Sequence, residues 1–495
     1  MKLTDFIEKL SPVLSDFSIF SNPEITGVTN QSGEVKPGMI FCAVKGSKFD
    51  GHNFLSEAIQ NGAAGFVVHE SFSGDTPQNT FRVSDSYFAW AILCAEMAGN
   101  PGDHLRVHGI TGTNGKTTIA MLLHYFLTVA AKRKTGLLTT VFTDVCNGIR
   151  NDSANTMPDA KALQNFFAQM LHNGAQDAVM ECSSHGLSQT RSGRLRFYSA
   201  IFTNLTGDHL DYHGSMENYY QAKKRLFTVS AAAGMPAIIN IDDSAGKRLY
   251  DELFSESVNP VSVSLRDTSA DYYASDLSLN EGKSSFIIHS CDGVFPIQTR
   301  LTGQHNVYNF LCAFAAAAET GTPPADIAAA APEAPAAPGR LEAFALPSGA
   351  HVFVDYAHTD DALLHVTQTL NAVRKKGGRL ITVFGCGGDR DRTKRPRMGK
   401  AAAENSDIVI VTSDNPRTED PMAIIREILP GIPAGKTYMV EPDRRKAILL
   451  ALSQAKNGDQ ILIAGKGHES YQEICGIRYH FDDREEVQRF SGNNN

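Results

Sequence analysis

Two features that would define a protein class at once are missing from this sequence. Its eight cysteines include no Cys-x-x-Cys pair, which argues against a disulfide framework or a structural zinc site and predicts reduced thiols in a cytoplasmic protein. No apolar run reaches the roughly 18 residues that a transmembrane helix needs. The first stretch, residues 1–17, carries charges throughout, so no signal peptide is expected.

An excess of positive charge is also missing. The chain has 46 Lys and Arg against 54 Asp and Glu, for a formal net charge of -8. This balance argues against a general nucleic-acid or anionic-membrane binder, although a local basic pocket stays possible. With 42% hydrophobic and 20% charged residues, the composition is that of an ordinary globular protein.

The length predicts more than one domain. A chain of 495 residues is too long for a single core, and a prior of about 150 residues per domain suggests roughly three. Short β-like runs at 39–44 and 63–68 predict a small α/β domain over residues 1–98, before the turn-rich GNPGDH. We assign 99–337 to a central domain, which ends in a proline-rich connector, and 338–495 to a last domain.

The central and last domains both alternate apolar runs with helical segments, which predicts largely parallel sheets covered by helices. Strands are expected within 105–110, 177–182, 199–205 and 236–241, and within 351–358, 379–391, 407–417 and 459–469. Ligands bind at the carboxyl ends of strands in open α/β sheets. The four charged loops that end the later strands should therefore face one crevice.

The sequence HGITGTNGKTT predicts a phosphate-binding loop between a strand and a helix. Gly112 and Gly115 let the backbone turn its N–H groups toward phosphate oxygens. Lys116 can reach the β- and γ-phosphates, and the hydroxyl of Thr117 suits Mg²⁺. The spacing is not the standard one, because Ile110 stands where the first glycine would fall. The alternative is a glycine-rich turn that happens to contain a lysine.

Acidic and histidine-rich loops follow the next two predicted strands. Glu181 in MECSSHG and the stretch TGDHLDYHG (206–214) offer oxygen and nitrogen ligands. Mg²⁺ takes a few oxygen ligands plus substrate phosphates, which favours magnesium over zinc here. Helix caps and turns explain any one of these residues equally well, and only their joint position indicates a metal–nucleotide site. Lys223 and Lys224 lie on a predicted helix, where a solvated face is the simpler interpretation.

Taken together, these segments resemble the ATP-dependent Mur ligases, and the matching stretches follow the family order over nearly the whole chain. They are GTNGKTT (112–118), ECSSHGLSQTR (181–191), FTNLTGDHLDYHG (202–214), GQHNVYN (303–309), PGRLE (338–342), VDYAHTDDAL (354–363), FGCGGDRDRTKRP (384–396), DNPRTEDP (414–421) and AGKGHESYQ (464–472).

The resemblance implies a fold and a reaction. The fold is α/β with a UDP-substrate domain, a central P-loop ATPase-like sheet and a C-terminal Rossmann-like sheet that binds an amino acid. ATP, with Mg²⁺, phosphorylates the D-glutamyl carboxylate of UDP-N-acetylmuramoyl-L-alanyl-D-glutamate, and an amine attacks the acyl phosphate. The protein is expected to act as a monomer, with domain closure around the site.

The resemblance also implies roles for individual residues. ATP would be bound by Gly112, Thr113, Asn114, Gly115, Lys116, Thr117, Thr118, His305, Asn306, Arg340, Asp355 and His358. Magnesium would be served by Thr117, Glu181, His209 and Lys223, the last as a carbamate (N6-carboxylysine). Lys116, Glu181, His209 and Lys223 would be catalytic. The adjacent Lys224 leaves a one-residue alternative for the carbamate.

For the UDP-linked dipeptide, the resemblance implies Ser32, Asn155, Thr156, Met157, Ser183, Gln189 and Arg191. The family's usual DSR for uridine recognition is altered, because Gln31 and Gly33 replace its Asp and Arg. UDP binding is expected to persist through other contacts.

The stretch DNPR predicts the amino acid that is added. Meso-diaminopimelate carries a distal carboxylate and ammonium, whereas L-lysine carries only the ammonium. Arg417 can hold the carboxylate in a bidentate fork and Asp414 can face the ammonium. By resemblance, Arg390, Asp414, Asn415, Pro416, Arg417, Gly465 and Glu469 form this pocket.

Three alternatives remain. The same ligase could add L-lysine. A folylpolyglutamate synthetase would share the phosphate loop but would not explain the first domain or DNPR. A P-loop binding module without ligase chemistry would need only residues 105–240 and would leave the charged C-terminal loops unexplained.

Overall fold

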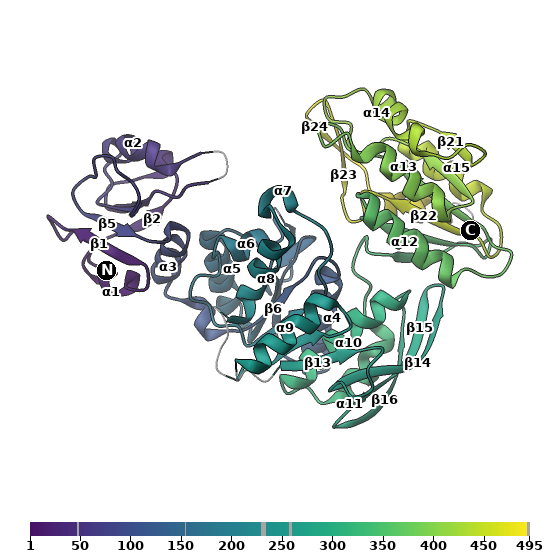
Figure 1. The fold of residues 1–495 in the computed structure, drawn as a ribbon, viewed down its shortest axis with the longest axis horizontal. Coiled ribbons are helices and arrows are strands. Elements are labelled where there is room, and N and C mark those ends of the chain that lie inside the picture. The colour runs from purple at the N-terminus through teal and green to yellow at the C-terminus, as the bar shows by residue number, and fades with distance from the viewer. Residues whose placement is uncertain (47–48, 154, 229–233, 257–259, 493–495) are drawn as a thin grey trace. The chain divides into compact units, whose positions relative to one another are not determined.

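The computed structural model describes residues 1–46, 49–153, 155–228, 234–256 and 260–492. The chain forms two compact units, one of Met1–Val263 with Cys312–Pro323 and one of Ser264–Leu311 with Pro324–Asn495 (Figure 1). Within the described residues, no helix is both long and apolar enough to cross a membrane. The predicted domain boundaries at 98 and 337 stay a prediction.

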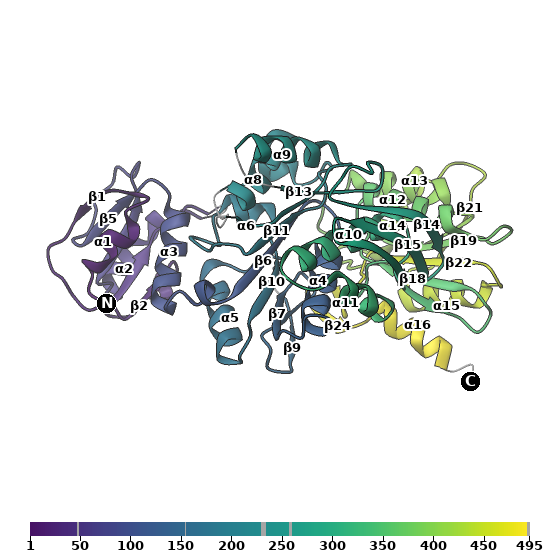
Figure 2. The same ribbon diagram turned by 90° about the horizontal axis from the view of Figure 1, so that it is seen from below.

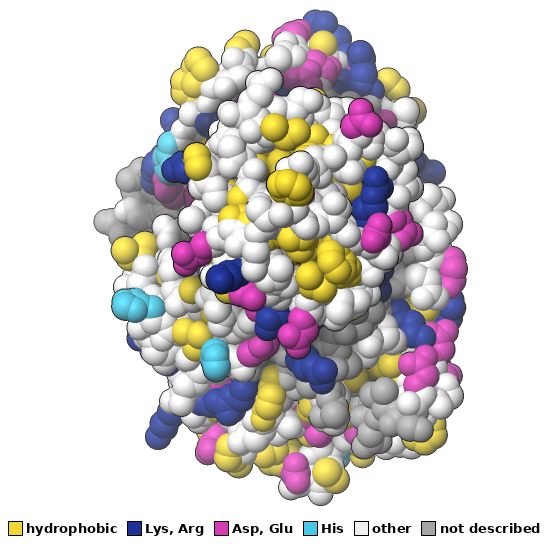
Figure 3. Space-filling model, turned by 90° about the vertical axis from the view of Figure 1, so that its left-hand side faces the viewer, with side chains coloured by type: hydrophobic (Ala, Val, Ile, Leu, Met, Phe, Trp, Pro, Cys, Tyr) yellow, Lys and Arg dark blue, Asp and Glu magenta, His cyan; other side chains and the backbone are white. Residues whose placement is uncertain are grey.

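The first unit begins with a small α/β layer. Its sheet has the order β1-β5-β4-β3-β2, with β1 antiparallel to β5 and the other neighbours parallel. The strands are β1 (Leu14–Ser18), β2 (Gly27–Thr29), β3 (Met39–Cys42), β4 (Gly65–His69) and β5 (Thr80–Val83), and the helices are α1 (Asp5–Leu10), α2 (Leu55–Gln60) and α3 (Ser86–Ala98). The face drawn in Figure 3 shows Lys and Arg side chains interspersed with Asp and Glu.

The larger sheet of this unit is built around β6. Its strands follow the order β13-β12-β11-β6-β10-β7-β8-β9, and they are parallel from β13 to β7. The strands are β6 (Arg106–Thr111), β7 (Thr135–Leu138), β8 (Phe142–Asp144), β9 (Arg150–Asp152), β10 (Asp177–Glu181), β11 (Ser199–Phe202), β12 (Ala237–Asn240) and β13 (Pro260–Ser264). The helices are α4 (Lys116–Val129), α5 (Ala160–His172), α6 (Ser184–Ser188), α7 (Leu210–His213), α8 (Met216–Thr228) and α9 (Ser244–Ser255) (Figure 2). The four strands predicted here are confirmed.

A buried polar array ties the amino ends of three neighbouring strands of this sheet. His108 Nδ1 lies 2.7 Å from Ser199 Oγ and its Nε2 lies 3.0 Å from Asp177 Oδ1. The second oxygen of Asp177 accepts from Arg106 at 2.9 Å and lies 3.4 Å from Arg133 Nε. Burial lowers the pKa of His108. Burial also opposes ionisation of Asp177, but His108 and the two arginines outweigh it, so the pKa of that carboxyl is lowered.

The second unit contains a mostly parallel sheet of order β17-β18-β22-β19-β20-β21, with antiparallel β17 at its edge. The strands are β17 (Glu342–Ala345), β18 (His351–Asp355), β19 (Leu380–Phe384), β20 (Ile408–Val411), β21 (Thr437–Val440) and β22 (Gln460–Ala464). Helices α12 (Asp360–Val373), α13 (Lys394–Asn405) and α14 (Pro421–Ile428) pack into one apolar core, while α15 (Arg444–Gln454) and α16 (Asp483–Gly492) pack into the other. The four predicted strands are confirmed here too.

Several elements of the structure lie outside the predicted strand–helix alternation. The strands β14 (Tyr272–Asn280), β15 (Lys283–Ser290) and β16 (Gly293–Thr299) form an antiparallel meander, and β23 (Tyr471–Ile474) pairs with β24 (Ile477–His480). The remaining helices are α10 (Gln304–Glu319) and α11 (Pro324–Ala330), and the short 3₁₀ turns are Ser32–Glu34, Gly51–Phe54, Pro101–His104, Ala331–Glu333 and Leu429–Gly431.

Candidate active site

The phosphate loop leaves β6 at Thr111 and enters α4 at Lys116. Gly112 has φ +145°, and a Cβ placed there would lie 1.9 Å from the hydroxyl oxygen of Thr203, so only glycine fits. Gly115 precedes the helix with φ +87°. The loop rests on the segment after β11, because Thr203 Oγ1 donates to the carbonyl oxygen of Asn114 at 2.6 Å. The backbone is therefore held in the shape that presents the helix N-terminus to an anion.

Lys116 folds back over this loop. Its Nζ donates to the carbonyl oxygens of Gly112 at 3.0 Å and Thr113 at 2.8 Å. The next two residues, Thr117 and Thr118, lie in the first turn of α4 and are mostly buried. The ammonium is thus already beside the loop that would hold a phosphate.

Lys223 approaches the same loop from α8. Its Nζ donates to the Gly112 carbonyl oxygen at 2.7 Å and lies 4.4 Å from the centre of the Tyr219 ring. The residue is only 1% exposed, and burial, followed by the neighbouring charge of Lys116, lowers the pKa of Lys223 well below its usual value. The adjacent Lys224 instead lies 3.1 Å from both Glu252 and Glu256. The structure therefore places Lys223, rather than Lys224, at the phosphate loop.

Glu181 ends β10 next to the phosphate loop, since it is the register partner of Ile110 on β6. The side chain is buried, and its carboxylate accepts from the backbone N–H of Thr140 at 2.9 Å. The Thr140 hydroxyl lies 3.1 Å from the second carboxylate oxygen and 3.0 Å from the hydroxyl of Thr156. Thr140 thus connects a predicted metal ligand with a predicted substrate ligand, and no sequence motif marks it.

The histidine-rich loops form a ring cluster around α7. The His209 ring lies 4.9 Å from that of His185 and 6.2 Å from that of Tyr219, and His209 has φ +52°. His213 Nε2 lies 3.0 Å from the hydroxyl of Ser184. In the part of the chain that the structure describes, no three His, Cys, Asp or Glu side chains are placed to hold a metal by themselves. A metal at this edge would therefore need substrate oxygens, which suits Mg²⁺.

Two of the residues predicted to hold the dipeptide, Met157 and Gln189, contact a third, Arg191. Arg191 Nη1 donates to the carbonyl oxygen of Met157 at 2.6 Å, and its Nε and Nη2 donate to Gln189 Oε1 at 3.0 and 2.8 Å. Ser183 caps α6 by accepting from the N–H of Gly186, while Asn155 is exposed. Ser32 lies in the small α/β layer, and its hydroxyl donates to the Glu57 carboxylate at 2.6 Å.

The second unit holds the other predicted ATP ligands. Arg340 follows Gly339, whose added Cβ would lie 2.1 Å from the backbone of Gly467, so the PGR turn packs closely on the GKGH loop. Asp355 is mostly buried and accepts from the N–H groups of Leu341 and Ala357 at 2.7 and 2.8 Å. Burial raises the pKa of Asp355. The carboxylate thereby fixes the turn that carries Arg340.

The arginine and histidine side chains of this set are more accessible. The Arg340 guanidinium lies 4.9 Å from the centre of the Tyr356 ring. His305 and His358 are exposed, whereas Asn306 is buried and donates to the carbonyl oxygen of Thr302 at 2.9 Å.

The predicted amino-acid pocket lies where β20 and β22 end. Asp414 is 8% exposed, and its Oδ1 has no hydrogen-bond partner among the described residues. The carboxylate lies 3.7 Å from the place that a Cβ on Gly465 would take. Asn415 Nδ2 donates to Glu469 at 2.9 Å. Asp414 is thus a buried carboxylate whose Oδ1 accepts no hydrogen bond from the residues that the structure describes, although the Lys466 ammonium lies 3.7 Å away, and it is suited to accept a ligand ammonium.

Arg417 is held from two sides. It has φ +52°, its Nη1 donates to the Gly388 carbonyl oxygen at 2.7 Å, and its Nε lies 3.6 Å from Glu473. Arg390 is exposed and contacts the carbonyl oxygen of its neighbour Asp389. Downstream, Asp420 caps α14 by accepting from the backbone N–H of Met422, and Pro421 is the first residue of that helix. The second half of the loop, Asp420 and Pro421, is therefore structural, because it starts α14.

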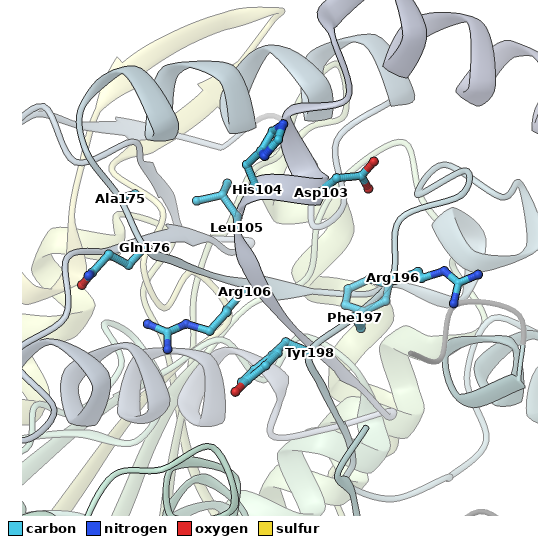
Figure 4. A pocket seen from close by; sticks show the side chains of 9 residues that line it. All are labelled: Asp103, His104, Leu105, Arg106, Ala175, Gln176, Arg196, Phe197 and Tyr198. Carbon is cyan, nitrogen blue, oxygen red and sulfur yellow. The ribbon is translucent and has the colours of Figure 1, made fainter. Parts of the chain in front are cut away.

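A cavity of about 670 Å³ lies elsewhere, at the amino ends of β6 and β11. Its lining residues are Asp103, His104, Leu105, Arg106, Ala175, Gln176, Arg196, Phe197 and Tyr198. Figure 4 shows Arg106 and Tyr198 extending to one side and Arg196 to the other, and the Arg106 guanidinium lies 5.8 Å from the centre of the Tyr198 ring. The phosphate loop lies at the opposite, carboxyl end of β6, so this cavity is not the nucleotide site.

Three family descriptions match the chain: "Mur ligase family, catalytic domain" at residues 24–83, "Mur ligase middle domain" at 110–317 and "Mur ligase, glutamate ligase domain" at 339–467. Curated relatives named UDP-N-acetylmuramoyl-L-alanyl-D-glutamate–2,6-diaminopimelate ligase include one from Nostoc sp., 42% identical over 491 residues, covering 98% of this chain and 96% of the relative. Another, from Aquifex aeolicus, is 40% identical over 472 residues and covers 94% of each.

Solved structures agree with these matches. A structure with the same ligase name is 35% identical, has a TM-score of 0.70 and covers 95% of each chain. A Mycobacterium tuberculosis folylpolyglutamate synthase shares the fold alone, with a TM-score of 0.60 at 19% identity over 76% of this chain and 92% of that one. The expected three-domain α/β fold class is confirmed by the Mur ligase structures among these neighbours.

Proposed function

Because this chain belongs to the Mur ligase family, we propose that it is an ATP-dependent ligase that joins meso-diaminopimelate to UDP-N-acetylmuramoyl-L-alanyl-D-glutamate in peptidoglycan precursor synthesis. The observation that carries this proposal is sequence identity: relatives with this name are 42% and 40% identical to the chain over nearly its full length. The phosphate loop and the Asp414–Arg417 pocket supply the two kinds of site that such a reaction requires.

The phosphate loop binds the ATP phosphates. Backbone N–H groups of residues 112–118 and the N-terminus of α4 face the anion, and Lys116 moves from the Gly112 and Thr113 carbonyl oxygens to the terminal phosphates. Positioning and charge compensation provide most of the rate increase in phosphoryl transfer. In the second unit, the residues that we propose as ATP ligands, by resemblance to the family, are His305, Asn306, Arg340, Asp355 and His358.

Magnesium fits the residues beside this loop. Thr117, Glu181, His209 and Lys223 would hold it, and the ion would neutralise charge on the phosphates. Lys223 fits as a carbamate, because its buried amine lies against the Gly112 carbonyl and beside the cation Lys116, where a second ammonium is unfavourable. The nitrogen of the neutral amine can bond to the carbon of CO₂ and release one proton, and the resulting carbamate offers oxygen ligands in place of a cation.

The reaction then uses the residues that we propose to hold the UDP-linked dipeptide. Together with Ser32, the residues Asn155, Thr156, Met157, Ser183, Gln189 and Arg191 orient the UDP-linked dipeptide so that its D-glutamyl carboxylate attacks the γ-phosphorus of ATP. ADP leaves and an acyl phosphate forms. The amine of the incoming amino acid attacks the acyl carbon, phosphate leaves, and the amine proton is released.

The amino acid is selected in the second unit. Arg417 takes the distal carboxylate of diaminopimelate, Asp414 takes its ammonium, and Arg390, Asn415, Pro416, Gly465 and Glu469 shape the rest of the pocket. L-lysine lacks the carboxylate that Arg417 would bind, so it is the weaker candidate.

An amino-acid panel tests the proposal. Phosphate release is measured with ATP, Mg²⁺ and UDP-N-acetylmuramoyl-L-alanyl-D-glutamate, and with meso-diaminopimelate, L-lysine or L-ornithine. We expect release to require the dipeptide substrate and to be fastest with diaminopimelate. Lys116→Ala, checked for folding by circular dichroism, is the inactive control, with turnover reduced by roughly 100-fold or more. ATP turnover that ignores the dipeptide substrate would contradict the proposal.

A further inference from the structure

Lys466 is a fully buried cation in the amino-acid pocket, and neither the motif assignment nor the reaction accounts for it. The residue has 0% exposure. Its Nζ lies 3.0 Å from Asn415 Oδ1, 3.3 Å from Glu469 Oε2 and 3.7 Å from Asp414 Oδ1. The ammonium, which has only donors, thus donates to Asn415 and Glu469, and it lies within ion-pair distance of Asp414.

These contacts connect loops from strands that are not neighbours. Asp414 and Asn415 follow β20, whereas Lys466 and Glu469 follow β22, and β19 lies between the two strands in the sheet. The residue that follows β19 is Gly385, and a Cβ there would lie 2.4 Å from the carbonyl oxygen of Thr412. The chain therefore leaves no side chain at this point, and the Lys466 ammonium joins the two loops across the end of the sheet.

Lys466 also sets the orientation of the Asn415 amide. Asn415 Oδ1 accepts from Lys466 Nζ and from the N–H of Glu473, both at 3.0 Å, while its Nδ2 donates to Glu469 at 2.9 Å. A flipped amide would place its NH₂ group against the ammonium and its oxygen against the carboxylate. The cation thus fixes which way Asn415 presents its donor and acceptor.

Lys466 also balances the negative charge of the pocket. Asp414 and Glu469 are both mostly buried carboxylates close to the same ammonium. Without Lys466, two anions would face each other in one desolvated pocket, and a ligand carboxylate entering beside them would be repelled. With it, one negative charge remains for a ligand ammonium, and Arg417 remains for a ligand carboxylate.

We propose that Lys466 is a positioning residue for amino-acid selection: it orders the 414–417 and 465–469 loops and balances their charge so that the pocket accepts a zwitterionic centre. The inference rests on the proposed ligase function. It assigns Lys466 an effect on how diaminopimelate is bound and distinguished from L-lysine, and no direct part in phosphoryl transfer.

The test compares Lys466→Met with Lys466→Arg and with the control Lys456→Met, which removes an exposed lysine from the same unit. KM is measured for ATP, for the UDP-linked dipeptide and for diaminopimelate, and kcat/KM for diaminopimelate is divided by that for L-lysine. In Lys466→Met we expect the KM for diaminopimelate to rise roughly 10- to 100-fold, the other two KM values to change less than about threefold, and the diaminopimelate-to-lysine ratio to fall. Lys466→Arg, which keeps the charge, should recover part of the ratio, and Lys456→Met should match the wild type.

Equal rises of all three KM values, or an unchanged diaminopimelate-to-lysine ratio, would overturn the role of Lys466. If Lys466→Met does not fold, Lys466→Gln, which keeps a donor without the charge, is judged by the same ratio. The wild type is assayed first, so that a protein that does not use diaminopimelate at all contradicts the proposed function rather than this inference.

Discussion

Lys223 Nζ donates a hydrogen bond to the carbonyl oxygen of Gly112, 111 positions away in the sequence, at 2.7 Å. The contact brings a buried amine from α8 to the residue at which the phosphate loop begins. Its neighbour Lys224 points to Glu252 and Glu256 instead. Two adjacent lysines with the same chemistry therefore have different surroundings, and their substitutions should have different consequences.

We predict that Lys223→Ala lowers ligase turnover by roughly 100-fold or more, whereas Lys224→Ala changes it less than about twofold. The reason is that Lys223 lies at the phosphate loop, and Lys224 makes partly exposed ion pairs that contribute little to stability. Phosphate release under saturating substrates measures both effects, and circular dichroism checks that both variants fold.

Carbamylation of Lys223 can be tested separately, through the dependence of ligase activity on CO₂. Depletion of CO₂ and bicarbonate should lower wild-type and Lys224→Ala activity reversibly, and their return should restore it. Full activity of Lys223→Ala, or activity that is indifferent to CO₂ in the wild type, would contradict the carbamate.

The specificity of the pocket is tested at Arg417. We predict that Arg417→Ala raises the KM for diaminopimelate by roughly 10- to 100-fold, because it removes a charge-assisted contact to the distal carboxylate. The KM for ATP should change little, and the loss with L-lysine should be smaller, since L-lysine has no such carboxylate. Steady-state kinetics with the three substrates varied in turn give the comparison.

Arg426→Ala is a suitable control for Arg417→Ala. It also removes an arginine, but from the exposed surface of the last turn of α14, the helix that follows the loop. It should leave all three KM values near those of the wild type. If Arg417→Ala weakened ATP and diaminopimelate equally, Arg417 would be a structural residue of the loop rather than a ligand for the carboxylate.

The sequence predicts the parallel strands well because they are buried on both faces and read as continuous apolar runs, as in β10 and β22. The meander was missed for the opposite reason. Its strands are buried on one face only, as in β15, where Ser284, Phe286 and Ile288 are buried and the residues between them are partly exposed. In β14 the register with β15 also shifts between Ser275 and Ser278. Such strands do not read as continuous apolar runs.

The residues of the candidate site also differ in how well the sequence predicts them. The phosphate loop could be predicted because its glycines, lysine and threonine are adjacent in the sequence. Composition could not separate Lys223 from Lys224, since burial by Tyr219 and the Gly112 carbonyl decides between them. Lys466 stands in the motif AGKGHE, but its partner Asn415 is 51 positions away, and only the folded sheet brings the two together.

The buried His108–Asp177 pair makes a pH-dependent contribution to stability. Burial holds the pKa of His108 below its usual value of about 6.5, so the unfolded state takes up a proton on this residue before the folded state does. The free energy of unfolding should therefore fall as the pH drops below about 6.5, by up to about 1.4 kcal/mol per pH unit from this residue. The lowered pKa of Asp177 adds a second loss only at lower pH, below its unfolded value of about 3.9.

We predict that His108→Gln lowers the free energy of unfolding at neutral pH, because it disturbs the bonds to Asp177 and Ser199, and makes the fall between about pH 7 and about pH 5 shallower than in the wild type. Urea unfolding followed by circular dichroism at both pH values measures the difference. The control His172→Gln removes an exposed histidine from the end of α5 and should keep the wild-type pH dependence. Since other buried histidines contribute equally to the wild type and both variants, the difference between His108→Gln and the wild type isolates His108. If the free energy of unfolding changed with pH equally in His108→Gln and in the wild type, His108 would already be protonated in the folded state. Asp177 would then be paired with a cationic His108.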